Sequence, residues 1–289
     1  MISLNDRFSY VGNTPLMRLG ENLWAKLETF SLTGSVKDRL ISFILARAIS
    51  RGDIDENSVL VEATSGNTGI SLAAHGAKLG LKVKIIMPKN MSAERKQMMS
   101  IYGAEIIEVG DSDFEGAIVA RNNLVASNTR YWSPNQFENL DNILCHRLTT
   151  APEISSQLPP GVKWEAFVSG AGTGGTIMGV QQYVNAVGSL DTKVIMVMPA
   201  EDSKKHGIQG INDGADFLVD HTCIDESISI KTTDAKNRAR RLASENGLLV
   251  GISAGANVLA AEMWIRKNKP KGAVVTILCD RGERYLSIL

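Results

Sequence analysis

The sequence predicts an α/β protein with open, doubly wound, mostly parallel sheets. Short apolar runs alternate with segments of helical periodicity through most of the 289 residues. Such runs are typical of parallel strands that are buried on both faces. Their uneven spacing gives too few regular βα units for an eight-fold barrel. Several turns between a strand and a helix are also rich in glycine, as ligand-binding turns of doubly wound sheets are.

The elements follow in order from these runs. The expected strands are the apolar runs 24–28, 58–62, 83–87, 106–109, 166–168, 194–198, 248–250 and 274–278. The expected helices lie at 40–49, 70–79, 92–102, 114–126, 177–186 and 258–265. Pro88 stops one strand, and Pro159-Pro160-Gly161 is a break before the second group of strands. This order places each glycine-rich turn at the carboxyl end of a strand.

Composition and charge exclude several classes of protein. The chain has 31 basic and 31 acidic residues and no long basic cluster, which argues against a nucleic-acid or acidic-membrane partner. Its three cysteines are widely spaced and its four histidines are scattered, so neither a disulfide framework nor a metal site is indicated. No apolar run reaches the length of a membrane span, and the first residues lack a signal-peptide core. We therefore expect a soluble, cytoplasmic protein.

A lysine stands at the expected start of the first long helix, in Thr33-Gly34-Ser35-Val36-Lys37-Asp38-Arg39. Ser35 and Asp38 match the S-x-x-D capping box, which predicts a helix that begins near Ser35. Backbone N–H groups carry partial positive charge in the first helical turn, so we expect the Lys37 amine to lose its proton more readily than an exposed lysine. A neutral amine can form a Schiff base with an aldehyde. The alternative is a solvated lysine.

The turn Thr64-Ser65-Gly66-Asn67-Thr68-Gly69 gathers hydroxyls, a side-chain amide and backbone N–H groups between a strand and a helix. Because the helix dipole favours an anion there, the turn predicts a site for a carboxylate or a phosphate. An ordinary helix cap is the alternative, although six polar or glycine residues in a row exceed what a cap needs.

A second turn, Ser169-Gly170-Ala171-Gly172-Thr173-Gly174-Gly175-Thr176, can fold its N–H groups into a nest around a phosphate. It is not a Walker loop, since no Gly-Lys-Ser/Thr follows. Its glycines at 170, 172 and 175 also satisfy the dinucleotide pattern, with Glu201 or Asp202 as the ribose acid. A nicotinamide dehydrogenase is therefore a competing interpretation, which leaves the turns at Lys37 and Ser65 without a function.

A third glycine turn, 251–257, again connects an expected strand to an expected helix. Its Ser253 would offer a hydroxyl to the ligand crevice at the carboxyl ends of the strands. The alternative is that Ser253 caps the helix.

Together these turns resemble those of the fold-type II pyridoxal-phosphate enzymes, and among them the cysteine synthases (O-acetylserine sulfhydrylases). The likeness runs from about Val11 to Ser287. The motifs that carry it are Gly12-Asn13-Thr14-Pro15-Leu16, Ser35-Val36-Lys37-Asp38-Arg39, Glu62-Ala63-Thr64-Ser65-Gly66-Asn67-Thr68-Gly69, Asn135-Gln136-Phe137 and Gly282-Glu283-Arg284-Tyr285-Leu286.

The resemblance implies a role for each turn and the cofactor pyridoxal 5'-phosphate. Lys37 would bind the coenzyme covalently and act as the catalytic base, Asn67 would bond the ring hydroxyl oxygen, and Ser253 would face the pyridine nitrogen. The phosphate would be held by Gly172, Thr173, Gly174, Gly175 and Thr176. The substrate carboxylate would be held by Thr64, Ser65, Gly66, Thr68 and Gln136, with the backbone near Gly210 bordering the site.

The implied reaction is β-replacement on an O-activated serine. O-acetyl-L-serine would lose acetate, and sulfide or another sulfur donor would add to the resulting α-aminoacrylate to give L-cysteine. A neutral hydroxyl at Ser253 cannot stabilise a pyridinium as a carboxylate would, so we expect β-elimination to be favoured over transamination and racemisation. The alternatives are cysteine lyase or cystathionine synthase chemistry on the same scaffold, and a catalytically silent protein that binds an amino acid or a partner.

The resemblance also implies a smaller, mobile domain over residues 38–140 and a larger, coenzyme-anchoring domain of residues 1–37 and 141–289. A homodimer and a serine acetyltransferase partner are expected on the same basis. Cys279-Asp280-Arg281 resembles the B-type enzymes, whereas the segment 207–214 is closer to the A-type. Asp213 in that segment would, as a hypothesis, activate water and direct the enzyme toward lyase or serine-forming chemistry. An aspartate in a surface turn is the alternative.

Overall fold

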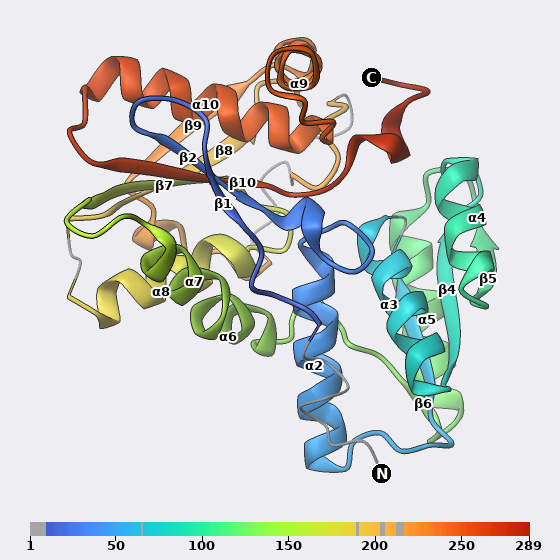
Figure 1. Ribbon diagram of the computed structural model, residues 1–289. Coiled ribbons are helices and arrows are strands. Elements are labelled where there is room, and N and C mark those ends of the chain that lie inside the picture. Colours follow the sequence, from blue (N-terminus) through green and yellow to red (C-terminus); the bar gives the residue numbers. More distant parts are fainter. Residues whose placement is uncertain (1–9, 65, 189–190, 203–205, 212–216) are drawn as a thin grey trace. The chain divides into compact units, whose positions relative to one another are not determined.

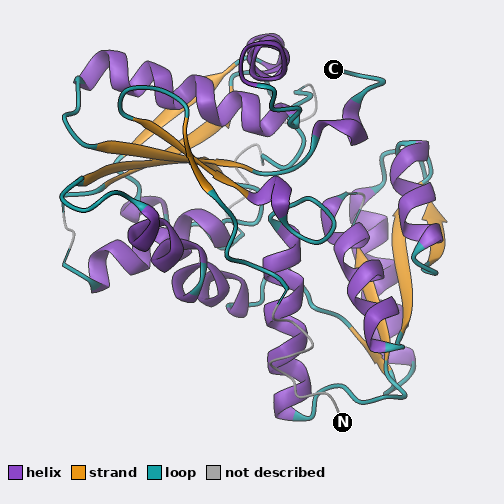
Figure 2. Cartoon of the chain, viewed as in Figure 1, coloured by secondary structure: helices purple, strands orange, loops and turns teal. Residues whose placement is uncertain are grey.

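The computed structural model describes residues 10–64, 66–188, 191–202, 206–211 and 217–289 (Figure 1). The chain divides into two compact units, one of Met1–Val11 and Ser31–Asn139 and the other of Gly12–Phe30 and Leu140–Leu289. In each unit helices cover a mostly parallel sheet, so the predicted α/β class is confirmed (Figure 2). This division assigns Lys37 to the first unit, whereas the sequence placed the boundary after it. The mobility expected of residues 38–140 stays a prediction.

The first unit is built on a parallel sheet with the strand order β5-β4-β3-β6. Its strands are β3 (Val59–Ala63), β4 (Lys82–Pro88), β5 (Glu105–Val109) and β6 (Tyr131–Trp132). Its helices are α2 (Lys37–Arg51), α3 (Asn67–Leu79), α4 (Ala93–Ile101) and α5 (Phe114–Ser127). One core, which includes Leu45 of α2 and Leu72 of α3, fills one face of the sheet, and a second core with Ala117 lies beneath α5. Apolar faces on α2, α3 and α5 thus bury both sides of the strands.

The second unit is built on a sheet with the strand order β1-β2-β10-β7-β8-β9. Its strands are β1 (Leu16–Arg18), β2 (Leu23–Leu27), β7 (Trp164–Gly170), β8 (Lys193–Pro199), β9 (Glu226–Ile230) and β10 (Ala273–Leu278). The pairings are parallel except at the edge, where β1 is antiparallel to β2. A parallel sheet of this kind has all its strand ends of one polarity at one edge, where ligands bind in doubly wound folds.

Helices cover both faces of this second sheet. Figure 1 shows α9 (Thr232–Asn246) and α10 (Ile252–Asn268) on one face. The helices α6 (Asp141–Leu148), α7 (Thr150–Gln157) and α8 (Gly175–Ala186) lie on the other face (Figure 1). Two apolar cores correspond to these layers, one with Leu242 and Val258 and the other with Ile154 and Ile177. Short 3-10 helices occupy Glu28–Phe30, His221–Cys223 and Gly282–Tyr285.

Most predicted elements are present with shifted ends, and one is wrong. Residues 248–250 form no strand, because Val250 makes an isolated antiparallel bridge to Arg281 instead. The helices expected from 70, 177 and 258 begin earlier, at Asn67, Gly175 and Ile252, so that the polar turns themselves form the first helical residues. No strand or helix predicted from the sequence corresponds to β1, β6, β9, α6, α7 or α9, because their patterns are short, half-exposed or polar.

Candidate functional site

Lys37 is the first residue of α2 and is half-buried. The buried carboxylate of Asp38 accepts hydrogen bonds from the N–H and the hydroxyl of Thr33, each at 2.8 Å, and from the N–H of Ser35 at 3.4 Å. The Ser35 hydroxyl is buried without a hydrogen-bond partner among the described residues. The predicted capping box is therefore half right. Asp38 reaches back as expected, but Ser35 does not cap the helix, which begins at Lys37.

The first polar turn connects the end of β3 to the start of α3. Asn67 and Thr68 are the first two residues of α3, so their N–H groups lie where a helix favours an anion. The hydroxyl of Thr64 accepts the N–H of Gly66 at 3.3 Å, which closes the turn. Ser65 lies outside the described residues. The start of α3 thus offers N–H groups of the kind that bind an anion, and binding of a substrate carboxylate there stays a prediction.

A distant segment of the first unit comes to this turn. The hydroxyl of Thr68 donates to Gln136 Oε1 at 2.7 Å, and both side chains are buried. The backbone of Gln136 is held by Glu62, whose Oε2 accepts the Gln136 N–H at 3.4 Å. Arg121 donates to Glu62 Oε1 at 3.3 Å and to Asn135 Oδ1 at 3.0 Å. The structure therefore brings together two of the predicted substrate-binding residues, Thr68 and Gln136.

Glu62 and Arg121 are residues that the sequence analysis did not assign to the site. Glu62 is fully buried in β3 between apolar neighbours. Desolvation raises the pKa of its carboxyl to about 7, against the opposing effects of Arg121 and of the N–H groups of Ala63 and Gln136. The signal in the sequence was a carboxylate inside an otherwise apolar strand, which a buried strand does not carry for packing alone.

The second glycine turn connects β7 to α8 in the second unit, and it has no room for side chains. A Cβ on Gly172 would lie 2.6 Å from the carbonyl oxygen of Gly210, and a Cβ on Gly175 would lie 1.9 Å from Oδ1 of Asn142. Gly174 precedes α8 with φ +91°, a left-handed conformation that favours glycine. This close packing places the loop backbone at the N-terminus of α8, as a phosphate nest requires. It also places Gly210 beside Gly172, next to the loop that is predicted to bind the phosphate.

Two buried side chains of α6 hold the two threonines of this loop. Asn142 donates to Thr173 Oγ1 at 2.8 Å. Nε2 of His146 lies 3.2 Å from Thr176 Oγ1, and its Nδ1 lies 2.9 Å from Thr150 Oγ1. Asn142 and His146 are four residues apart, so they lie on one face of the helix. The sequence analysis gave the histidines no role beyond structure, and no local pattern indicated these contacts.

Ser253 is the second residue of α10 and is buried. Its hydroxyl would lie 4.0 Å from a Cβ built on Gly210, so it stands close to the predicted border of the site. Asn257, one turn further along α10, accepts the N–H of Gly170 at 2.8 Å. The same side chain donates to Cys279 Sγ at 3.5 Å. Asn257 therefore connects the start of the glycine turn, the helix of Ser253 and the end of β10.

The predicted residues thus form two groups, each described within its own unit. The group in the first unit is Lys37, Thr64, Gly66, Asn67, Thr68 and Gln136. The group in the second unit is Gly172, Thr173, Gly174, Gly175, Thr176, Gly210 and Ser253. Asp213, like Ser65, lies outside the described residues.

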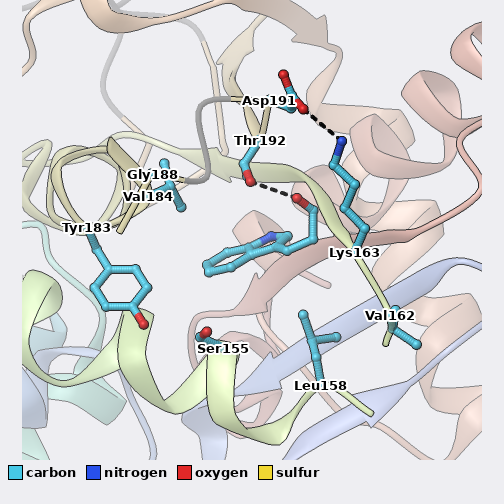
Figure 3. A pocket seen from close by; sticks show the side chains of 10 residues that line it. Ser155, Leu158, Val162, Lys163, Tyr183, Val184, Gly188, Asp191 and Thr192 are labelled. Carbon is cyan, nitrogen blue, oxygen red and sulfur yellow. Dashed lines mark hydrogen bonds and ion pairs between the residues drawn. The ribbon is translucent and has the colours of Figure 1, made fainter. Parts of the chain in front are cut away.

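The second unit also contains a cavity of about 600 Å³ that involves none of these residues (Figure 3). It lies at the amino ends of β7 and β8, opposite to the edge that carries the glycine turn. Figure 3 shows Tyr183 and Ser155 pointing toward it and an ion pair of 2.9 Å between Lys163 and Asp191 beside it. It is therefore separate from the candidate site.

In the described part of the chain, His, Cys, Asp and Glu residues form no group that could hold a metal ion. No helix there is long and apolar enough to span a membrane.

The groups that the glycine turn presents fit the phosphate of a coenzyme. A closely packed backbone at a helix N-terminus and two hydroxyls fixed by buried partners are the donors that a phosphate takes. Residues 8–280 match the family model described as pyridoxal-phosphate dependent enzyme. The chain therefore belongs to this family of enzymes. Membership of this family makes pyridoxal phosphate, and not a dinucleotide, the cofactor of this chain.

Comparison with known proteins narrows the class. The chain is 39% identical to cysteine synthase B of Campylobacter jejuni over 291 residues, which cover 96% of this chain and 95% of that protein. It is similar to a solved hydrogen sulfide-producing enzyme from Fusobacterium nucleatum, with a TM-score of 0.93, 35% identity, and coverage of 99% of this chain and 90% of that one. It is also similar to an O-acetylserine dependent cystathionine β-synthase from Helicobacter pylori, with a TM-score of 0.88, 33% identity, and coverage of 99% and 98%.

Proposed function

We propose that this chain is a pyridoxal-phosphate-dependent β-replacement enzyme. It takes an O-activated serine, most simply O-acetyl-L-serine, and a sulfur donor, and it makes L-cysteine. The observation that carries the proposal is the glycine cradle at the start of α8, whose threonines are fixed by Asn142 and His146, in a chain that belongs to the pyridoxal-phosphate family. The likeness to cysteine synthase B supports the choice of reaction.

When bound, the coenzyme supplies an electron sink that makes the Cα–H bond of an amino acid acidic. Gly172, Thr173, Gly174, Gly175 and Thr176 hold its phosphate, and Asn67 bonds its ring hydroxyl. Lys37 would hold the coenzyme covalently through Nζ, and its amine would be released when the substrate binds. The Lys37 amine then removes the Cα proton and returns it after the sulfur has added at Cβ.

The turn after β3 binds and orients the substrate. The N–H groups and hydroxyls of 64–68, together with the side-chain amide of Gln136, hold the substrate α-carboxylate. The hydrogen bond of 2.7 Å from Thr68 to Gln136 Oε1 supports this role, because it fixes the orientation of the amide group, whose nitrogen is the donor. A fixed carboxylate keeps the Cα proton directed at one base, which is how orientation accelerates a proton transfer.

Ser253 determines which reaction follows. It is neutral and buried, and it faces the pyridine nitrogen in the proposed arrangement. A neutral hydroxyl there would not stabilise a protonated pyridine nitrogen as a carboxylate would, so the coenzyme would stabilise negative charge at Cα less and loss of the β-substituent would be favoured. Elimination followed by addition is therefore favoured over transamination.

The test is spectroscopic and chemical. Purified protein mixed with pyridoxal 5'-phosphate should gain a visible absorption band, and borohydride should trap the coenzyme on a peptide that contains Lys37. Lys37→Ala should lose both the band and the trapping, whereas Lys82→Ala, which changes an exposed lysine of the same unit, should keep both. O-acetyl-L-serine and sulfide should then yield L-cysteine with the wild type. A colourless protein, or trapping at another lysine, would contradict the proposal.

Release of sulfide from L-cysteine is a second candidate function on the same scaffold. Two observations favour it, namely the likeness to the hydrogen sulfide-producing enzyme and the presence of Asp213 in the segment near Gly210. Asp213→Asn should abolish sulfide release and retain cysteine synthesis if the aspartate activates water. Equal loss of both activities would remove Asp213 from the argument.

The family likeness supports three further proposals about the state of the protein. It forms a homodimer, it binds a serine acetyltransferase, and it works in the cytoplasm. We also retain the smaller domain over residues 38–140 as the part that moves when substrate binds. Light scattering on the purified protein tests the dimer, and co-purification with a tagged serine acetyltransferase tests the partner.

A further inference from the structure

Glu62 is a fully buried carboxylate to which the proposed reaction assigns no step. It lies in β3, two residues before the substrate-binding turn begins at Thr64. Its two oxygens serve different segments. Oε1 accepts the N–H of Ala63 at 2.9 Å, and Oε2 accepts the N–H of Gln136 at 3.4 Å. One side chain therefore connects the strand that leads into the turn with a segment 74 residues further along the chain.

Arg121 extends this connection. It is buried on α5, and its Nη1 donates to Glu62 Oε1 at 3.3 Å, to Ser133 Oγ at 3.2 Å and to Asn135 Oδ1 at 3.0 Å. Asn135 adopts φ +48°, a left-handed conformation that asparagine tolerates better than most residues. The guanidinium thus fixes the path of the chain over 133–135, immediately before Gln136.

The segment fixed in this way contacts the start of α3 through Gln136. Gln136 Oε1 accepts the hydroxyl of Thr68 at 2.7 Å, so the side chain of Gln136 is oriented by α3 while its backbone is held by Glu62. We propose that Glu62 is a positioning residue that, with Arg121, holds Gln136 against Thr68 at the start of α3 so that both bind one substrate carboxylate. This inference rests on the proposed function, since it assigns how the same site recognises its amino acid.

Packing does not explain the pair. Removing a carboxylate and a guanidinium from water costs more than an ion pair recovers, and apolar side chains of similar size are often as stable or more stable in such a place. Desolvation raises the pKa of Glu62 to about 7, and Arg121 acts against this rise. A buried pair that costs stability is best explained by what it positions, and the atoms it touches are those of the 133–136 segment.

The experiment compares Glu62→Gln with the wild type, each loaded with pyridoxal phosphate. L-Serine is the probe, because its hydroxyl leaves poorly and its binding can be read from the coenzyme absorption without turnover. We expect the Kd of L-serine and the KM of O-acetyl-L-serine to rise by about tenfold or more. A tenfold change corresponds to about 1.4 kcal/mol, which is the order of what one misplaced hydrogen bond to the substrate carboxylate costs. The maximal rate should fall less, and the coenzyme affinity should not change.

A second readout does not depend on the coenzyme. Amide hydrogen exchange of the peptide that contains Gln136 should be faster in Glu62→Gln than in the wild type, because Oε2 of Glu62 accepts the Gln136 N–H. The control is Glu262→Gln, which removes one of the two carboxylates that pair with a buried arginine of α9, Arg238. The control should lower the melting temperature and leave both the Kd of L-serine and the exchange of the Gln136 peptide as in the wild type.

If Glu62→Gln does not fold, Arg121→Lys decides the question, because lysine keeps the charge but cannot reach Glu62, Ser133 and Asn135 with one planar group. A wild-type Kd in Arg121→Lys, or a wild-type Kd and exchange rate in Glu62→Gln, would overturn the inference. A wild type that binds coenzyme but shows no response to L-serine would instead contradict the proposed function, and faster exchange in the variant would still establish that Glu62 holds Gln136.

Discussion

The replacement of Glu62 by glutamine should also change how stability depends on pH. The glutamine keeps nearly the same shape in the interior of β3 but cannot ionise. In the wild type two effects compete for the pKa of this carboxyl. Desolvation raises it, and the positive charge of Arg121 at 3.3 Å lowers it, with desolvation prevailing to give a value of about 7.

The sign follows from which state holds the proton. Between the ordinary pKa of 4.5 and the raised value of about 7, the unfolded carboxyl is ionised while the folded one keeps its proton. The folded state therefore binds more protons, and stability falls as the pH rises through this window. The difference between 4.5 and 7 corresponds to a loss of about 3 kcal/mol of unfolding free energy. This loss is absent below pH 4.5 and complete above pH 7.

The assay is urea unfolding followed by circular dichroism at several pH values, for the wild type and for Glu62→Gln. Urea is uncharged, so it does not screen the ion pair with Arg121. Subtracting the two curves removes the other titrating groups and leaves the contribution of this carboxyl. We expect the wild type to lose stability relative to the variant as the pH rises from 4.5 to 7. A flat difference, or a wild type that gains stability with pH, would show that the pKa of Glu62 is not raised and would refute the reasoning.

Three other substitutions test the site. Gly175→Ala would place a methyl group 1.9 Å from Oδ1 of Asn142, so we expect the Kd of pyridoxal phosphate, titrated by absorbance, to rise by about tenfold or more, and an unchanged Kd would contradict the cradle. Asp38→Ala removes the acceptor of two hydrogen bonds from Thr33 and should lower the unfolding free energy by about 2 kcal/mol, which thermal unfolding measures. Ser253→Asp should slow β-replacement and produce a strong long-wavelength absorption band with amino acids. No change in either property would remove the role of Ser253.

Local patterns in the sequence determined the fold class and the positions of the turns. Apolar runs such as those of β3 and β4 are visible because their side chains are buried or half-buried on both faces, apart from the exposed Lys82 at the start of β4. The edge strand β9, whose residues alternate between half-buried and exposed, and the polar helix α9 gave no comparable signal. Residues 248–250 show the opposite error, since an apolar run there forms an isolated bridge and not a strand.

The sequence by itself also identified a lysine at a helix start, an anion-binding turn after β3 and a glycine cradle before α8, because each depends on residues that are neighbours along the chain. What holds these turns was decided only by the tertiary structure. Gln136 meets Thr68 across 68 residues, and Asn142 meets Thr173 across 31. No periodicity encodes such pairs, since a side-chain hydrogen bond depends on which elements the fold makes neighbours and on the geometry with which they meet.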